Sequence, residues 1–408
     1  MWELIKSNRR KSIIIFIGMG LLLILLGFLI GTAYIGDEGG FVGIFFAIIL
    51  WTILSSISYF AGSSILLSVS KAKEVTQSVH PQLFNVVEEM KIASALPYMP
   101  KIYIINEEAP NAFATGIKPE KSAIAVTSGL LSRLNRDELQ GVIAHEMAHI
   151  VNRDVLLMTF AGVMLGSIVI ISEVFLRSLW LGGGKRYSSK SKSSGQAQLI
   201  IMIVALVFAI LAPIIARLLY FAISRKREYL ADASAVRFTR YPEGLASALE
   251  KISSSNIELP SANKVTAPMY IINPLKKKGM KLSDLTSTHP PISERIRILR
   301  NLGGNIDYRS YQNAFNKVHG GTSKIIPDSA ITGDTMPLMA IAPVASEQKF
   351  DYKENKRTVG DAVMKLNGYS IINCSCGMKL KLPPGFGSNK PQIICPRCKT
   401  VHKISQAV

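Results

Sequence analysis

Two histidines and a glutamate stand at a spacing that suits metal-assisted hydrolysis. His145, Glu146 and His149 form the pattern His-Glu-x-x-His inside an apolar run without Gly or Pro between residues 142 and 150. On an α-helix, positions four apart lie on one face, so both imidazoles can bind one metal ion. Glu146 is offset by one position, and its carboxylate can reach a water at that metal without ligating it. The pattern predicts a catalytic zinc with Glu146 as the general base of peptide hydrolysis.

A catalytic zinc with three protein ligands needs one donor beyond the two histidines. Because five-residue patterns also arise by chance, such a donor decides between a metal site and a coincidence. Glu228 and Asp232 stand four apart in a second helical stretch. Glu228 can supply the third ligand, while Asp232 can hydrogen-bond a ligating histidine and fix its tautomer. The alternative, an exposed acidic pair on a charged helix, is common but leaves the histidines without a third partner.

A further histidine and arginine lie downstream. His289 precedes two prolines, which restrict the backbone after it, and Arg295 follows. A positioned His289 or Arg295 can act as a catalytic residue by stabilising the oxyanion that forms when a peptide carbonyl is attacked. A helix N-terminus with a solvated histidine explains the same residues equally well, and both interpretations stay open.

Long uncharged runs precede these residues. Residues 12–35 and 41–70 carry no charge, and each exceeds the roughly 20 apolar residues that cross a bilayer. Basic residues flank both outer ends and two acids lie between the runs, so the positive-inside rule predicts a transmembrane hairpin with the N-terminus and residue 71 onward in the cytoplasm. A cleaved signal peptide is rejected because the first run is too long and a second follows quickly.

A second pair of apolar segments separates the histidines from Glu228. Residues 155–181 are mainly apolar, residues 199–216 carry no charge, and a Gly/Ser/Lys loop joins them. The loop is basic, which is the wrong sign for the far side of a membrane. We still expect a spanning hairpin over residues 155–223, because both ends must return to one side to build one site. A hairpin that lies in the membrane or packs within the protein is the alternative.

Composition limits the class of protein. Hydrophobic residues make up 48% of the 408 residues and charged residues 18%, with a net charge of +19. With membrane spans predicted, the basic surplus favours a lipid bilayer as the anionic partner over nucleic acid. Between the first hairpin and the histidines, residues 81–154 predict a soluble α/β unit with a helix that begins at Pro81 and strands at 101–105 and 122–127.

The four cysteines all lie in the C-terminal tail: Cys374, Cys376, Cys395 and Cys398. Because the first 373 residues contain none, the chain is not a disulfide scaffold, and the cluster fits a metal site in a reducing compartment. Two close pairs around a Gly/Pro-containing stretch predict a structural four-cysteine zinc ribbon over 371–408, which zinc holds folded because the tail is too short for a core. His402 is a less favoured ligand. The ribbon can also bind a protein partner, whereas no aromatic-rich pattern supports nucleic acid.

The sequence resembles the HtpX family of membrane zinc metallopeptidases, relatives of the CAAX prenyl proteases, over residues 1–302. Four segments carry the resemblance and occur in the family's order: residues 111–116, 145–149, 224–232 and 289–291. The cysteine-containing tail is a departure from the family. The resemblance implies a multi-pass α-helical membrane protein with a mainly α, minor β gluzincin-like peptidase domain. It also implies a position in the inner membrane, a cytoplasmic catalytic face and the cleavage of membrane or misfolded proteins, as in protein quality control.

The resemblance also assigns residues. It supports His145, His149 and Glu228 as zinc ligands with Glu146 as base, places Asp232 behind a ligating histidine, and favours His289 or Arg295 in transition-state stabilisation. It suggests that one segment holds the substrate backbone by strand addition: Asn111, Ala112, Phe113, Ala114 and Thr115.

The expected organisation has four parts, with both termini cytoplasmic. Residues 1–70 form the first hairpin, residues 71–302 the peptidase domain interrupted by the second hairpin, residues 303–370 a linker or accessory unit, and residues 371–408 the ribbon. Two rival functions are a processing peptidase of the CAAX-protease kind and a non-enzymatic membrane scaffold whose ribbon binds a partner. The complete set of metal-ligating residues argues against the scaffold.

Overall fold

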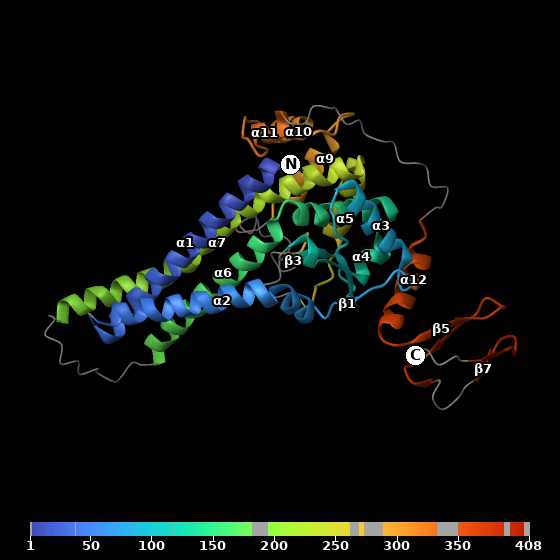
Figure 1. The fold of residues 1–408 in the computed structure, drawn as a ribbon, viewed down its shortest axis with the longest axis horizontal. Coiled ribbons are helices and arrows are strands. Elements are labelled where there is room, and N and C mark those ends of the chain that lie inside the picture. The colour runs from blue at the N-terminus through green and yellow to red at the C-terminus, as the bar shows by residue number, and fades with distance from the viewer. Residues whose placement is uncertain are drawn as a thin grey trace.

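The computed structural model describes residues 2–36, 38–116, 118–181, 195–261, 269–272, 289–332, 350–386 and 392–403. Long helices extend to one end of the molecule, and the C-terminal strands lie at the other (Figure 1). Between them lies a core in which helices pack on a small sheet. The mainly helical, multi-pass fold class expected from the sequence is confirmed.

Four helices form the extended bundle: α1 (Trp2–Ile35), α2 (Gly39–Val69), α6 (Asp154–Leu181) and α7 (Gly195–Thr239). Leu23 of α1, Ile168 of α6 and Ala209 of α7 belong to one buried cluster between them. In the described residues, three helices are long and apolar enough to cross a membrane, namely Ile13–Ile35, Gly39–Val69 and Leu199–Leu218. Of the loop predicted over residues 182–198, residues 195–198 belong to α7 instead, and residues 182–194 lie outside the described residues.

Glycines bring α1 and α2 into close contact. A Cβ on Gly27 would lie 2.7 Å from the carbonyl oxygen of Gly43, and one on Gly31 would overlap the carbonyl oxygen of Gly39. Small residues at helix interfaces let two backbones approach in this way inside a membrane. The first hairpin is therefore held by backbone proximity as well as by apolar side chains.

A four-stranded sheet supports the soluble core. Its order is β1-β2-β4-β3, made of β1 (Lys73–Glu74), β2 (Lys101–Ile105), β4 (Ser122–Thr127) and β3 (Ala112–Gly116). β2 and β4 are parallel, while β3 lies antiparallel to β4 at the edge. The two predicted strands are confirmed.

α5 (Arg136–Val151) packs on β3 and β4, and α4 (Ser128–Arg133) follows β4. α3 (Pro81–Ala93) and α8 (Pro242–Ser254) pack against α5. A capping box between Asn135 and Glu138 fixes the start of α5. Gly141 lets α8 approach, because a Cβ there would lie 2.7 Å from the backbone nitrogen of Leu245.

The stretch predicted as a linker or accessory unit is largely helical. After α9 (Ile292–Arg300) come α10 (Tyr308–His319), α11 (Asp328–Thr332) and α12 (Tyr352–Leu366). Tyr308 and Phe315 of α10 and Val359 of α12 belong to the main hydrophobic core. Their burial favours the accessory unit over the linker for these helices, while residues 333–349 lie outside the described part.

Two hairpins end the described chain: β5 (Ser370–Asn373) with β6 (Lys379–Leu382), and β7 (Gln392–Ile394) with β8 (Val401–Lys403). The carboxylate of Asp361 in α12 forms ion pairs with Lys379 at 2.7 Å and with Lys381 at 2.8 Å. Asn355 of α12 donates to the carbonyl oxygen of Leu131 at 2.6 Å. α12 thus connects the first of these hairpins, β5–β6, to the core.

Candidate metal centres

The His-Glu-x-x-His residues of α5 face Glu228 of α7 in the core. The Nε2 atom of His145 lies 3.6 Å from one carboxylate oxygen of Glu228, and Nε2 of His149 lies 3.5 Å from the other. The two imidazole planes are nearly perpendicular, at 88°. The three predicted ligands His145, His149 and Glu228, called the ligand trio below, therefore converge on one point from two helices.

These separations fit a shared zinc ion. Ligand atoms about 2.0–2.2 Å from a tetrahedral zinc lie roughly 3.4 Å from one another. Glu228 and His145 are no more than 1% exposed, yet Nε2 of His145 and one oxygen of Glu228 have no hydrogen-bond partner among the described residues. Buried polar atoms without partners are costly, and a bound cation satisfies both. The chemistry and spacing of the donor set thus suit zinc.

Each histidine has a carboxylate behind it. Nδ1 of His145 lies 2.9 Å from Asp232, as the sequence predicts, and Nδ1 of His149 lies 3.3 Å from Asp154. Sequence analysis missed Asp154, which opens α6 directly after the turn that ends α5. Such carboxylates orient a ligating imidazole and raise its basicity.

Arg295 lies behind Asp232 and is fully buried. Its Nε and Nη2 atoms donate to the two oxygens of Asp232 at 2.8 and 2.7 Å. Its Nη1 atom lies 3.5 Å from Glu228. This geometry makes Arg295 a support of the ligand set, while its contact with a transition state stays a prediction.

His289 approaches the same oxygen of Glu228 as His145 and Arg295 do. Its Nε2 atom is 3.8 Å from a Glu228 oxygen, and the residue is 5% exposed. The solvated histidine of the alternative interpretation is therefore wrong. Burial lowers the pKa of His289 to about 4, so the ring is neutral near pH 7.

Glu146 projects into the same site. It is 1% exposed, and neither carboxylate oxygen has a hydrogen-bond partner among the described residues. Burial raises its pKa, and the positive charges of the two histidines and the backbone amide of Ala114 oppose the shift. A carboxylate with a raised pKa is better matched to proton transfer near neutral pH than an ordinary glutamate.

The electrostatic environment of the ligand trio favours a positive charge. Burial lowers the pKa of His145, but its interactions with the carboxylates of Asp232 and Glu228 overcome this and raise it to about 9. Burial also acts to raise the pKa of Glu228, but nearby imidazoles hold it well below its usual range. The same carboxylates would stabilise a metal cation in place of these protons.

The predicted substrate-binding segment lies beside Glu146. Ala112, Phe113, Ala114 and Thr115 belong to β3, and Asn111 precedes it. β3 is an edge strand of the sheet and contacts α5, so the predicted edge position is confirmed. All five residues are buried.

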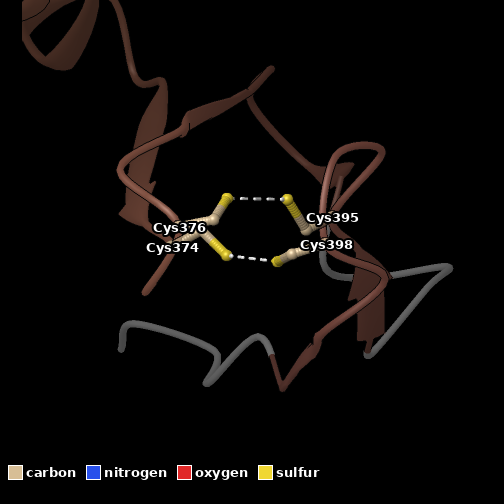
Figure 2. Close-up of side chains that lie close together, drawn as sticks. All are labelled: Cys374, Cys376, Cys395 and Cys398. Atoms are coloured by element: carbon tan, nitrogen blue, oxygen red, sulfur yellow. Dashed lines mark hydrogen bonds between the residues drawn. The ribbon is translucent and has the colours of Figure 1, made fainter.

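The four cysteines converge in a second cluster between the two C-terminal hairpins (Figure 2). The Sγ atoms of Cys374 and Cys398 lie 3.2 Å apart, and those of Cys376 and Cys395 lie 3.6 Å apart. Disulfides need about 2.05 Å, whereas sulfurs about 2.3 Å from a tetrahedral zinc lie roughly 3.8 Å apart. Hydrogen bonds from Thr400 lower the pKa of Cys398 to about 6, which favours the thiolate that metals bind.

Comparison with known proteins gives consistent matches. The profile of peptidase family M48 matches residues 77–302. The protease HtpX homolog of Dictyoglomus turgidum is 47% identical over 303 residues, which cover 74% of this chain and 95% of that protein. The homolog of Streptococcus uberis is 40% identical over 302 residues, covering 74% and 100%. The crystal structure of S. mikatae Ste24p is similar at 20% identity and a TM-score of 0.37, covering 73% of this chain and 67% of that one.

Proposed function

Because this chain belongs to peptidase family M48 and is a metallopeptidase, we propose that it is a zinc-dependent membrane endopeptidase with His145, His149 and Glu228 as ligands. It cleaves membrane or misfolded proteins at the cytoplasmic face, as a quality-control protease. The observation that carries this proposal is the convergence of three buried ligand atoms next to the unpartnered carboxylate of Glu146.

Different residues of this chain carry out the separate steps of peptide hydrolysis. Zinc, when bound, activates a water and polarises the scissile carbonyl. Glu146 accepts the proton of the attacking water and returns it to the leaving amine. His289, held neutral by burial, can donate a hydrogen bond to the developing oxyanion. Asp232, with Arg295 behind it, and Asp154 hold the two ligating imidazoles in orientation.

The topology follows from where the hairpins meet the core. The start of α1 lies near α10 and α11, and the end of α2 adjoins the sheet (Figure 1). Both ends of this hairpin therefore lie on the side of the metal site, and the basic residues around them favour the cytoplasm. α7 joins an apolar stretch to the Glu228 helix without a break, which supports a second hairpin that returns to this same side.

The cysteine cluster is a second zinc site in this proposal, with a structural role. The buried residues in its described part are Cys374, Leu380, Leu382 and Cys395, which are too few to hold 38 residues folded without a metal. Because the family profile ends at residue 302, the ribbon is an addition to the peptidase unit. Its zinc is expected to fix the hairpins on α12.

The test compares the wild type with Glu146→Gln and with Glu120→Gln, an exposed glutamate, as a matched control. Each is purified in detergent, loaded with zinc, and assayed on an unfolded protein, with metal content measured in the same samples. We expect Glu146→Gln to keep its zinc and to lose about 10²- to 10⁴-fold in kcat, while the control cleaves normally. Equal cleavage by both variants would remove the peptidase assignment from this site.

A further inference from the structure

A short stretch of the chain closes one side of the metal site. Residues 269–272 lie beside the edge strand β3 in the described structure. Tyr270 and Ile271 are no more than 2% exposed. Because the trio and Glu146 are also buried, a substrate cannot reach them along this edge while the stretch is in place.

The stretch makes one backbone hydrogen bond to the edge strand and two hydrogen bonds with the side chain of Asn111. The carbonyl oxygen of Asn111 accepts from Thr127 in β4, so the next carbonyl, that of Ala112, points to the free edge. The backbone N–H of Ile271 donates to this Ala112 oxygen at 2.9 Å. The side chain of Asn111 donates to the carbonyl oxygen of Ile272 at 2.9 Å and accepts from its N–H at 3.4 Å.

A residue next to the ligand trio also hydrogen-bonds to this stretch. Nη1 of Arg295 donates to the carbonyl oxygen of Ile271 at 3.3 Å and lies 3.5 Å from Glu228. Ile271 therefore spans the gap between the edge strand and the residues around the ligand trio. A peptide drawn across this gap for hydrolysis would need the same donors and acceptors.

The side chains show what kind of residue fits. The ring of Tyr270 packs edge-to-face on Phe113, with centroids 5.1 Å apart, and its hydroxyl lies 3.5 Å from that of Ser70. Ile271 belongs to the main hydrophobic core. The positions along the edge thus accept an aromatic residue followed by aliphatic ones.

We propose that residues 270–272 are an internal stand-in for substrate. The stretch occupies the backbone positions that a substrate takes up, and it leaves the edge strand before substrate binds. The site accordingly prefers extended segments in which an aromatic residue precedes aliphatic residues. This inference rests on the proposed peptidase function of the same site.

The deciding experiment follows exchange of the backbone amides rather than cleavage. Glu146→Gln, loaded with zinc in detergent, is mixed with a blocked peptide that has the sequence of residues 269–273. The control peptide carries aspartate at the three positions of Tyr270, Ile271 and Ile272. We expect the first peptide to speed hydrogen–deuterium exchange at Ile271 and Ile272 by at least about 10-fold, since exchange reports local opening. Unchanged or slower exchange would overturn the proposal.

A variant gives an independent readout. Ile271→Pro removes the N–H that donates to Ala112, and Ile257→Pro is the control, an exposed isoleucine in the same connection. Losing one hydrogen bond should raise kcat/KM on an unfolded protein by about 2- to 10-fold. Lower or unchanged kcat/KM at full zinc content counts against a stand-in. If wild type and variants all fail to cleave, the proposed function fails, while the exchange result still decides occupancy of the edge.

Discussion

Replacing Asp232 by asparagine isolates the charge that supports the ligand trio. Asp232 and Arg295 are both fully buried and share two hydrogen bonds of 2.7 and 2.8 Å, and Asp232 also lies 2.9 Å from Nδ1 of His145. Asparagine keeps the shape but removes the carboxylate that the guanidinium contacts most closely, which leaves Glu228 at 3.5 Å as an anionic neighbour. Breaking such a buried pair costs about 3–5 kcal/mol of folding free energy. Losing the partner of a ligating histidine weakens metal binding about 10- to 100-fold, or roughly 1.4–2.7 kcal/mol.

The assay measures zinc affinity by competition with a chelator and stability by denaturant unfolding in detergent. Asp328→Asn, whose side chain is 67% exposed and pairs with Lys324, serves as the control and should change neither quantity. Combining Asp232→Asn with Arg295→Met removes both charges, so stability should partly return while zinc affinity stays low. The reasoning is refuted if Asp232→Asn binds zinc within twofold of the wild type, or if the double variant is no more stable than the single one.

Three further outcomes are expected. The acid limb of kcat/KM should lie above pH 4.5, the ordinary pKa of a glutamate, because burial raises the pKa of Glu146 and the base must be ionised. A pH–rate profile at constant zinc content checks this, and a limb at or below pH 4.5 contradicts it. Cys376→Ser should remove the ribbon zinc and spare the catalytic one, so elemental analysis should fall from two ions to one; two retained ions would place the second metal elsewhere. Gly31→Val should force α1 away from Gly39 and lower the yield of folded protein in membranes by comparison with Gly18→Val, which meets open space; equal yields would deny the close contact.

Sequence reasoning worked best where one regular element carries the chemistry. The pairs His145/His149 and Glu228/Asp232 each stand four apart on a helix, so periodicity alone predicts their shared faces. The Cys spacing likewise predicts a metal cluster without tertiary information. Both groups converge in the structure within single clusters.

Contacts that depend on turns and long-range packing were beyond prediction. Asp154 follows a turn in which Arg153 has a φ of 60°, so helix periodicity could not bring it behind His149. Arg295 is one of two residues predicted to stabilise a transition state, and helix periodicity could not indicate its pairing with Asp232, which lies 63 positions away in the sequence. The sequence analysis does not predict the buried face of α10 either, because it assigns this amphipathic helix to a mixed linker or accessory segment.

Because α7 is continuous, it fixes the distance between the end of its apolar stretch and Glu228. The apolar stretch ends at Leu218 and the same helix presents Glu228 ten residues later, which corresponds to about 15 Å of helix. An extended peptide covers that distance with roughly five residues. In the proposed topology the apolar stretch of α7 crosses the membrane, and a membrane-protein substrate would then expose about five residues beyond the bilayer before its backbone reaches the metal site.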